Sequence, residues 1–502
     1  MDSAKLLLSF CLYWVRYHIY CKAQNQTHLR LSLSSVMAAE RDEPVTPAGR
    51  MFLRPEMDQV INCVVGHKNP IVVDALRSEV INSSMINHPR FSSLMVRDRH
   101  GRERWRKTEV DVDRHIIVFN EPVGGDIGMN DEDAINDYLA DLAVSSPLST
   151  DKPLWEIHLL MAHKCAVFRL HHALGDGISL MSLFLACCRR ADDPDQLPPI
   201  TSVGTSSKST NHHRENSFWR LIKAVWFTII YVIEFSLRSL WVRDKKTAVS
   251  GGAGVELWPR KLATAKFVLA DMKTVKNAIA DATINDVLFG VISAGISRYL
   301  DIRSSKEFNQ SSLLALQEGT QITGISMVNL RPQPGLQDVS DLMRSKSGSR
   351  WGNKFGMMLL PVFYHKGGAD SLHFVKRAKK MIDRKKLSLE AHFSYNIGYF
   401  VMCYLGPKLA SLLNYRIVCN TTFTISNVFG PQEELLLAGN PITYFRTNSS
   451  SLPHAITMHM VSYAGKADMQ ILVAKDIIPD PKLLAKCFED ALLEMKEAAA
   501  KI

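Results

Sequence analysis

The amino-acid sequence predicts an α/β protein built from two domains of similar design. The chain has 502 residues, which is long enough to bury two hydrophobic cores. A stretch rich in Pro, Ser, Thr and Asp at residues 192–216 and the glycine-rich joint at 251–254 separate two halves. Each half mixes alternating apolar runs, typical of strands, with runs of helical spacing. Two α/β sandwiches are therefore expected.

The composition changes along the chain define the predicted organisation. Residues 1–36 are either an extension upstream of a more usual start at Met37 or a signal anchor. Their apolar run at 6–15 is short for a membrane span and lacks a small-residue cleavage site. The first domain is expected at 37–191, a linker at 192–254 and the second domain at 255–502.

The strands are predicted from alternating or continuous apolar runs bounded by turn signals. Gly101 closes a turn after the run at 91–97, and the short polar break at 162–164 indicates a hairpin. The predicted strands are 62–65, 91–97, 155–160, 167–170, 263–269, 322–329, 355–363, 423–431 (which ends in a turn), 454–463 and 468–474.

The helices are predicted from apolar residues that recur at helical spacing. The helix at 131–143 carries acidic residues in its first turn, where the helix dipole favours them. The predicted helices are 71–82, 131–143, 178–188, 218–242, 272–279, 284–300, 371–387 and a terminal helix from Pro481.

The composition restricts the class of partner. The formal net charge is +10, which suits anionic phosphates, an acidic membrane surface or nucleic acid. No nucleic-acid-binding motif is visible, so no nucleic acid partner is expected. The nine cysteines form no CxxC pair and have no metal-ligand spacing, which indicates reduced, intracellular thiols.

The most apolar long segment, 218–242, is predicted to be an amphipathic helix. At about 100° per residue, Arg220, Lys223, Glu234 and Arg238 fall within roughly 60° of one another, and the rest of the surface is apolar. Such a helix fits a membrane interface, a span whose charged stripe faces protein, or a soluble core. Four charges argue against an isolated lipid-facing span.

The most informative motif is HHALGDG at residues 171–177. It occupies the turn between a predicted strand and a predicted helix, and glycines on both sides of Asp176 permit a tight turn. The turn presents one imidazole while Asp176 braces the loop. A neutral imidazole can accept a proton from an alcohol at cellular pH.

Two other interpretations apply to a pair of adjacent histidines. They can be core residues with satisfied hydrogen bonds, which is the usual case for an arbitrary pair. They can also bind a metal, but neighbouring strand residues point to opposite faces and seldom share one ion.

Four motifs, in order along the chain, resemble those of the wax ester synthase/diacylglycerol acyltransferase family. HHALGDG resembles the HHxxxDG motif of the CoA-dependent acyltransferase superfamily, and PLWE at 153–156 resembles the PLW element. Asn285 and Asp286 resemble the ND motif, and SNVFGP at 426–431 resembles SNVxGP. With the turn-rich segment at 44–52, the resemblance covers about residues 40–500 and is to plant-type members. The departures are the N-terminal extension and Phe429, where bacterial members more often have proline.

The resemblance implies a fold similar to chloramphenicol acetyltransferase, with two α/β sandwich domains and the active site in a tunnel between them. It implies an acyl-CoA-dependent O-acyltransferase. Fatty acyl-CoA would be the donor, and a long-chain alcohol or diacylglycerol the acceptor, so both wax ester synthase and diacylglycerol O-acyltransferase activities are expected. No cofactor is expected, because acyl-CoA is itself a substrate. No metal site is expected either.

The motifs suggest a role for each candidate residue. His172 is the expected general base, and no acyl-enzyme is needed if both substrates meet in one tunnel. Asp176 is expected to be structural, through hydrogen bonds or an arginine pair, and His171 to support the strand. Ser426 and Asn427 are candidate donors to the oxyanion. The expected substrate-binding residues are Leu154, Trp155, Gly177, Asn285, Asp286, Ser426 and Asn427.

Bulk along the expected tunnel predicts the preferred acceptor. Leu154, Trp155, the segment 355–363 and Phe429 are large, and extra volume in a packed site is poorly tolerated. A single-chain alcohol should therefore be preferred to diacylglycerol.

The expected location is the endoplasmic reticulum membrane, with the catalytic domains in the cytosol; the plasma membrane is the second choice. Two rival functions remain open at this point. One is a soluble CoA-dependent acyltransferase that acts on phenolic or amine acceptors. The other is a catalytically silent lipid-binding scaffold of the same fold.

Overall fold

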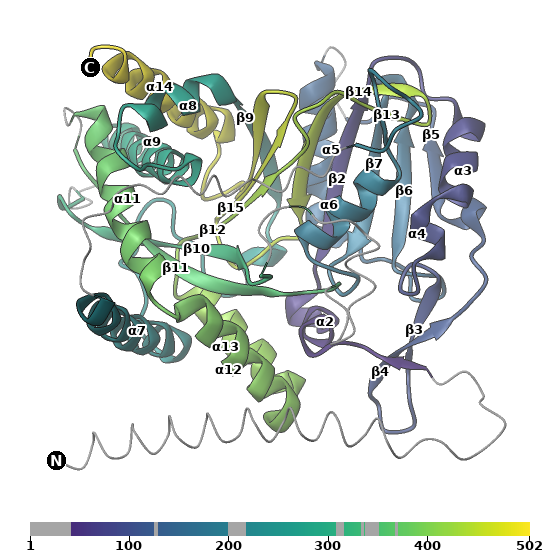
Figure 1. The fold of residues 1–502 in the computed structure, drawn as a ribbon, viewed down its shortest axis with the longest axis horizontal. Helices are drawn as coiled ribbons and strands as arrows, with labels where there is room; N and C mark the ends of the chain where they lie inside the picture. The colour runs from purple at the N-terminus through teal and green to yellow at the C-terminus, as the bar shows by residue number, and fades with distance from the viewer. Residues whose placement is uncertain are drawn as a thin grey trace. The chain divides into compact units, whose positions relative to one another are not determined.

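The computed structural model describes residues 42–124, 129–198, 217–307, 316–332, 336, 351–366 and 370–502. The predicted extension at 1–36 and most of the predicted linker, from 199 to 216, lie outside the described residues. Residues 44–502 form one compact unit. Within that unit two large sheets carry most of the helices (Figure 1).

The first sheet has seven strands in the order β5-β6-β7-β2-β14-β13-β8. Its strands are β5 (Ile116–Phe119), β6 (Trp155–Leu160), β7 (Cys165–His171), β2 (Val60–His67), β14 (Asn440–Ser449), β13 (Leu435–Leu437) and β8 (Arg189–Arg190). Its central strands are antiparallel, and β5 pairs with β6 in parallel. The predicted strand 155–160 coincides with β6.

Helices cover both faces of the first sheet because both faces of its strands are apolar. In β7, Cys165 and Val167 pack with α5 (Asp131–Ser145), whereas Ala166 and Phe168 face the opposite side. That side is covered by α3 (Val73–Asn82), α4 (Ser84–Asn87) and α6 (Gly177–Ala186). A separate hairpin consists of β3 (Ser93–Arg97) and β4 (Glu103–Lys107).

The second sheet has six strands in the order β11-β10-β12-β15-β16-β9. They are β11 (Phe355–Phe363), β10 (Gln321–Asn329), β12 (Phe423–Phe429), β15 (Ile456–Tyr463), β16 (Lys466–Ala474) and β9 (Arg260–Val268). β12 is parallel to both of its neighbours. The predicted strand 355–363 coincides with β11.

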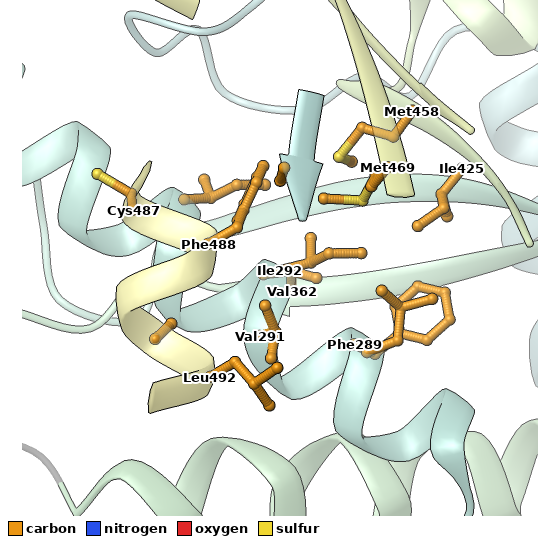
Figure 2. Packing of buried hydrophobic residues seen from close by; sticks show 14 of the residues in the cluster. Phe289, Val291, Ile292, Val362, Ile425, Met458, Met469, Cys487, Phe488 and Leu492 are labelled. Atoms are coloured by element: carbon orange, nitrogen blue, oxygen red, sulfur yellow. The ribbon is translucent and has the colours of Figure 1, made fainter. Parts of the chain in front are cut away.

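A helical layer closes the core of the second sheet. It consists of α8 (Leu269–Asn277), α9 (Ile284–Glu307), α11 (Ser371–Leu387) and α14 (Pro481–Ala499). Figure 2 shows how Val291 and Ile292 of α9 lie between Phe488 of α14 and sheet residues such as Ile425 and Met458. The predicted helix 371–387 coincides with α11.

The two sheets do not divide at the predicted domain boundary near residue 254. β13 and β14 come from the second half of the sequence, yet they extend the first sheet, with Phe445 opposite Val65 of β2. The polar strand β14 was not predicted, because its partner lies far away in the sequence. The first sheet is therefore complete only with a contribution from residues 435–449.

A group of helices lies below the second sheet in Figure 1. It comprises α7 (Ser217–Leu240), α12 (Glu390–Phe400), the π-helix η5 (Val401–Leu405) and α13 (Pro407–Cys419), and α7 contacts both α12 and α13. Gly406 adopts a positive φ of 89° between η5 and α13, a conformation that favours glycine. Only α7 of this group was predicted. Among the described residues, no helix is long and apolar enough to cross a membrane.

Candidate active site

His172 lies directly after β7, on the turn that leads into α6, and lines a cavity of about 210 Å³. The cavity walls come from both sheets, including β2, β10, β12 and β15, and from the short helix α2 (Pro47–Phe52). The imidazole stacks on Phe52, with 4.2 Å between the ring centroids. The backbone N–H of His172 donates to the Gln59 carbonyl at 2.8 Å, which fixes the turn against the start of β2.

Asn353 determines which nitrogen of His172 carries the proton. Its Nδ2 donates to the His172 carbonyl at 2.8 Å, and its Oδ1 lies 2.9 Å from His172 Nδ1. A carbonyl oxygen only accepts, so the amide nitrogen must face it and the amide oxygen must face the ring. His172 Nδ1 therefore carries hydrogen, and the lone pair resides on Nε2.

Burial lowers the pKa of His172 below its usual value, because a charged imidazole is poorly solvated there. The hydrogen bonds of the ring and the negative charge of Asp176 oppose this shift. The balance favours neutral imidazole at cellular pH. A neutral ring with a lone pair on Nε2 can accept a proton.

His171 has no nitrogen left for chemistry. Its Nδ1 accepts from the Ala173 backbone N–H at 3.0 Å, and its Nε2 donates to Asp58 at 2.9 Å. The side chain is buried and does not line the cavity. The two adjacent histidines therefore point to different surroundings.

Asp176 links the motif turn to the second half of the chain. Its Oδ1 accepts from the Ser179 backbone N–H at 3.0 Å, which caps the N-terminus of α6. Both carboxylate oxygens also accept from Arg331, at 2.8 and 3.0 Å, and Oδ2 accepts from the Lys354 backbone N–H at 2.9 Å. A bidentate pair of this kind is strong and directional.

Arg331 is almost completely buried and has further acceptors. It donates to the Gly352 carbonyl at 2.7 Å and to the Ser179 hydroxyl at 2.9 Å, and the Asn329 amide oxygen accepts from it at 3.1 Å. The arginine therefore joins the end of β10 to the start of α6. The sequence predicted an arginine pair for Asp176, but it identified neither Arg331 as the partner nor Asn353 as a residue of the site.

Leu154 and Trp155 do not line the cavity. Trp155 is fully buried, stacks on His115 with centroids 3.8 Å apart, and donates its indole N–H to the Phe91 carbonyl at 2.9 Å. Leu154 is buried in the same core. Both residues lie in the first core, so the substrate contact expected of them stays a prediction, and neither is used in the argument about tunnel width.

The predicted Asn285–Asp286 pair holds a helix end. Asp286 is fully buried and accepts from the backbone N–H and the hydroxyl of Thr283 at 2.6 and 2.8 Å, at the start of α9. Asn285 accepts from the Asn427 amide at 2.8 Å, so it touches the site through β12. Neither residue of the pair lines the cavity.

Ser426, Asn427, Gly177 and Asp176 do line the cavity with His172. A Cβ at Gly177 would lie 3.2 Å from Val428, so the first turn of α6 approaches β12 closely.

Two polar side chains that sequence reasoning missed complete this wall. Thr457 and His459 lie on β15, and His459 is in register with Ser426 of β12. Within the described chain, Thr457 Oγ1 and His459 Nδ1 have no hydrogen-bond partner. Burial, with a smaller effect of His172, lowers the pKa of His459 to about 4, so it is neutral at cellular pH. The cavity therefore offers polar groups with unused hydrogen-bonding capacity.

Two further cavities adjoin the one that contains His172. A large cavity of about 500 Å³ shares Met51, Phe355, Met357 and Asn414 with it. A smaller cavity of about 90 Å³ extends into the first core between α3, α6 and β2. Its lining is almost wholly apolar, and it shares Ile61, Gly177, Val428, Thr447 and Val461 with the His172 cavity. His172 thus lies between two apolar spaces.

Comparisons with known proteins agree on one family. The wax ester synthase/diacylglycerol acyltransferase catalytic domain matches residues 65–288, and the WS/DGAT C-terminal domain matches residues 351–496. Wax ester synthase/diacylglycerol acyltransferase 11 of Arabidopsis thaliana is 35% identical over 91% of this chain and 95% of its own. Protein 4 of the same series is 37% identical, over 92% and 91%.

Solved structures support the fold. A wax ester synthase/diacylglycerol acyltransferase from Marinobacter aquaeolei VT8 aligns with a TM-score of 0.56 at 16% identity, covering 91% of this chain and all of that one. The first condensation domain of the calcium-dependent antibiotic synthetase aligns with a TM-score of 0.54 at 12% identity, covering 92% and 97%. The predicted two-part α/β fold, similar to chloramphenicol acetyltransferase, is confirmed.

Proposed function

The chain belongs to the wax ester synthase/diacylglycerol acyltransferase family, and from this premise we propose that it transfers a fatty acyl group from acyl-CoA to an alcohol hydroxyl. The observation that carries the proposal is the pairing of His172 with Asn353, which leaves the Nε2 lone pair available in the cavity. The acceptor is a long-chain alcohol or a diacylglycerol.

The proposed reaction has two proton transfers and no acyl-enzyme. His172 Nε2 takes the proton of the acceptor hydroxyl while the hydroxyl oxygen attacks the thioester carbonyl. The tetrahedral intermediate then collapses, the C–S bond breaks, and the imidazolium returns the proton to the leaving CoA sulfur. Asn353 accepts a hydrogen bond from Nδ1 throughout, and the charge of Asp176 favours the transient imidazolium.

The oxyanion needs donors that are already in place before the reaction. Ser426 and Asn427 remain the proposed donors, but the Asn427 amide already donates to Asn285. The Thr457 hydroxyl is a further candidate, because it is buried at the cavity wall without a partner in the described chain.

The two apolar cavities suit the two hydrocarbon chains of the reaction. The smaller cavity beside α6 would take the acyl chain of the donor, and the larger cavity would take the acceptor. Met51, Phe355 and Met357 border the connection between the larger cavity and His172. Three bulky residues at this passage favour a single-chain alcohol over diacylglycerol. Phe429 is half exposed and does not line the cavity, so it plays no part in this argument.

Release of free CoA tests the proposal directly. Palmitoyl-CoA is incubated with and without hexadecanol, and acceptor-dependent thiol release is expected. His172→Ala should abolish it, whereas His100→Ala, on an exposed turn, should not. Binding of palmitoyl-CoA without turnover would instead indicate a lipid-binding scaffold. Competition between hexadecanol and dioleoylglycerol for labelled palmitoyl-CoA tests the acceptor, and predominantly labelled triacylglycerol would contradict the preference.

The proposed location is the endoplasmic reticulum membrane, with the catalytic unit on the cytosolic side, where acyl-CoA is available. The plasma membrane is the second choice. The support is the large apolar outer surface of α7, which a soluble enzyme for phenolic or amine acceptors would not need. Imaging of a tagged chain against organelle markers tests this, and a uniform cytosolic signal would exclude it.

A further inference from the structure

The helices α7, α12, η5 and α13 expose an unusual number of large apolar side chains. Six of them define what we name the apolar face: Trp219, Trp226, Ile233, Phe400, Leu405 and Leu412, each between 44% and 61% exposed. The first three lie on α7 and the others on the neighbouring segment 400–412, which contacts α7 through α12 and α13. A patch of this kind on a chain of ordinary composition marks a surface that is covered in use.

The exposed charges carried by these helices are of one sign. Exposed cations Arg220, Lys223, Lys408 and Arg416 belong to the same helices. The only acidic residues in these helical segments are Glu234 and Glu390. Both turn inward to Lys385, whose Nζ lies 3.7 Å from Glu234 and 2.9 Å from Glu390. An apolar surface with cations and inward carboxylates matches a bilayer that carries anionic lipids.

The polar groups on the inner side of α7 contact the rest of the protein, and its outer side is apolar. The buried Arg238 donates to Asp244 at 2.9 Å and to the Asn420 carbonyl at 3.2 Å, and Lys385 lies over the Tyr231 ring at 3.7 Å. The polar groups in the C-terminal half of the helix therefore bind protein. The predicted charged stripe is split, because Glu234 and Arg238 face the protein while Arg220 and Lys223 are exposed.

The large cavity opens within this surface. Leu240 of α7 and Ile397 and Tyr399 of α12 are 42%, 37% and 50% exposed, and the same three residues line the cavity. At its inner end the cavity reaches Phe355 and Met357, which also line the His172 cavity. The large cavity and the His172 cavity therefore adjoin, and together they extend from the apolar face to the proposed base.

We infer that the apolar face docks on an anionic bilayer and that the water-insoluble acceptor enters the large cavity laterally from the lipid, between α7 and α12. The inference rests on the proposed function for the identity of the acceptor, but docking itself does not. Val401 and Met402 of η5 also line the cavity, and η5 is a π-helix, a rare element that is often found at functional sites. A hydrocarbon chain on this route reaches His172 without crossing water.

Flotation with vesicles tests docking without any need for catalysis. The full chain should float with vesicles of phosphatidylcholine and phosphatidylserine, and less with phosphatidylcholine alone. Trp226→Glu/Ile233→Glu should weaken flotation roughly tenfold or more, because two large apolar side chains no longer enter the bilayer. Leu493→Glu is the matched control, since Leu493 is 50% exposed on α14, away from this face.

A chain without residues 1–36 tests whether the apolar run at 6–15 is the membrane anchor instead. It should float as the full chain does. If removal of residues 1–36 abolished flotation while Trp226→Glu/Ile233→Glu floated normally, the apolar run at 6–15 would be the anchor and the inference would be overturned.

The entry route is tested by the physical form of the acceptor. Trp226→Glu/Ile233→Glu should lower kcat/KM at least tenfold for hexadecanol supplied in vesicles, but change it less than about twofold for water-soluble hexanol. An equal loss with both acceptors would overturn the lateral route. Absence of turnover with either acceptor in the unmodified chain would instead refute the proposed function, and the flotation result would still stand.

Discussion

The pairing of Asp176 with Arg331 allows a quantitative prediction for Asp176→Ala. The substitution removes the cap of α6, which costs about 1 kcal/mol. It also leaves the buried guanidinium without its carboxylate, a change that typically costs about 3–5 kcal/mol. Asn329, Ser179 and Gly352 still accept hydrogen bonds from the arginine, so the lower end of the range applies. We expect a loss of roughly 4 kcal/mol, a large part of a typical total of about 5–15 kcal/mol.

Urea unfolding, monitored by intrinsic tryptophan fluorescence, measures this loss in the free energy of unfolding. The double variant Asp176→Ala/Arg331→Met is the decisive comparison, because it removes the uncompensated charge and replaces it with an apolar chain. It should recover at least roughly 2 kcal/mol relative to Asp176→Ala. Acyl transfer should fall in both variants, since the turn that carries His172 loses its brace. A loss below about 1 kcal/mol for Asp176→Ala, or no recovery in the double variant, would refute the assigned role of the pair.

Four further predictions concern the reaction. Burial lowers the pKa of His172, and the base must be neutral to act. We therefore expect kcat/KM to be at its maximum above that pKa and to fall as the pH decreases through a midpoint below 6.5. Asn353→Leu should lower kcat/KM. It should also move this midpoint to lower pH, because the hydrogen bond from His172 to Asn353 raises the pKa and the variant lacks it; an unchanged pH profile would exclude the pairing. Leu183→Trp, which fills the smaller cavity beside α6, should shift the donor preference from palmitoyl-CoA to shorter acyl-CoA, and equal losses for all chain lengths would argue against an acyl-chain site. Phe355→Ala should raise the share of triacylglycerol when hexadecanol and dioleoylglycerol compete, and a constant ratio would show that the passage does not select the acceptor.

The sequence predicted the elements whose patterns are local. The apolar run of β11 and the helical spacing of α11 needed no information from elsewhere in the chain, and their bounds agree with the structure. The segment 390–419 was missed, because its apolar residues lie partly on the outside and show no single buried stripe. Periodicity identifies a helix only when one face is buried and the other is polar.

The site was only partly predictable for a similar reason. His172 was identified from a compact motif, whereas Asn353 contacts it across 181 residues of sequence and Arg331 reaches Asp176 across 155. Nothing in the local sequence around 353 indicates that role. Trp155 shows that a residue of a recognisable motif can lie in a packed core, which the motif alone does not reveal.

The insertion of β14 beside β2 has a consequence for biosynthesis. While the chain emerges from the ribosome, the long inner edge of β2 stays unpaired until residue 449 has been made, although β2 itself ends at His67. An unpaired strand edge is a template for association with other chains. The first sheet can therefore close only after nearly the whole polypeptide has been synthesised, and this edge of β2 lacks its native partner strand during most of translation.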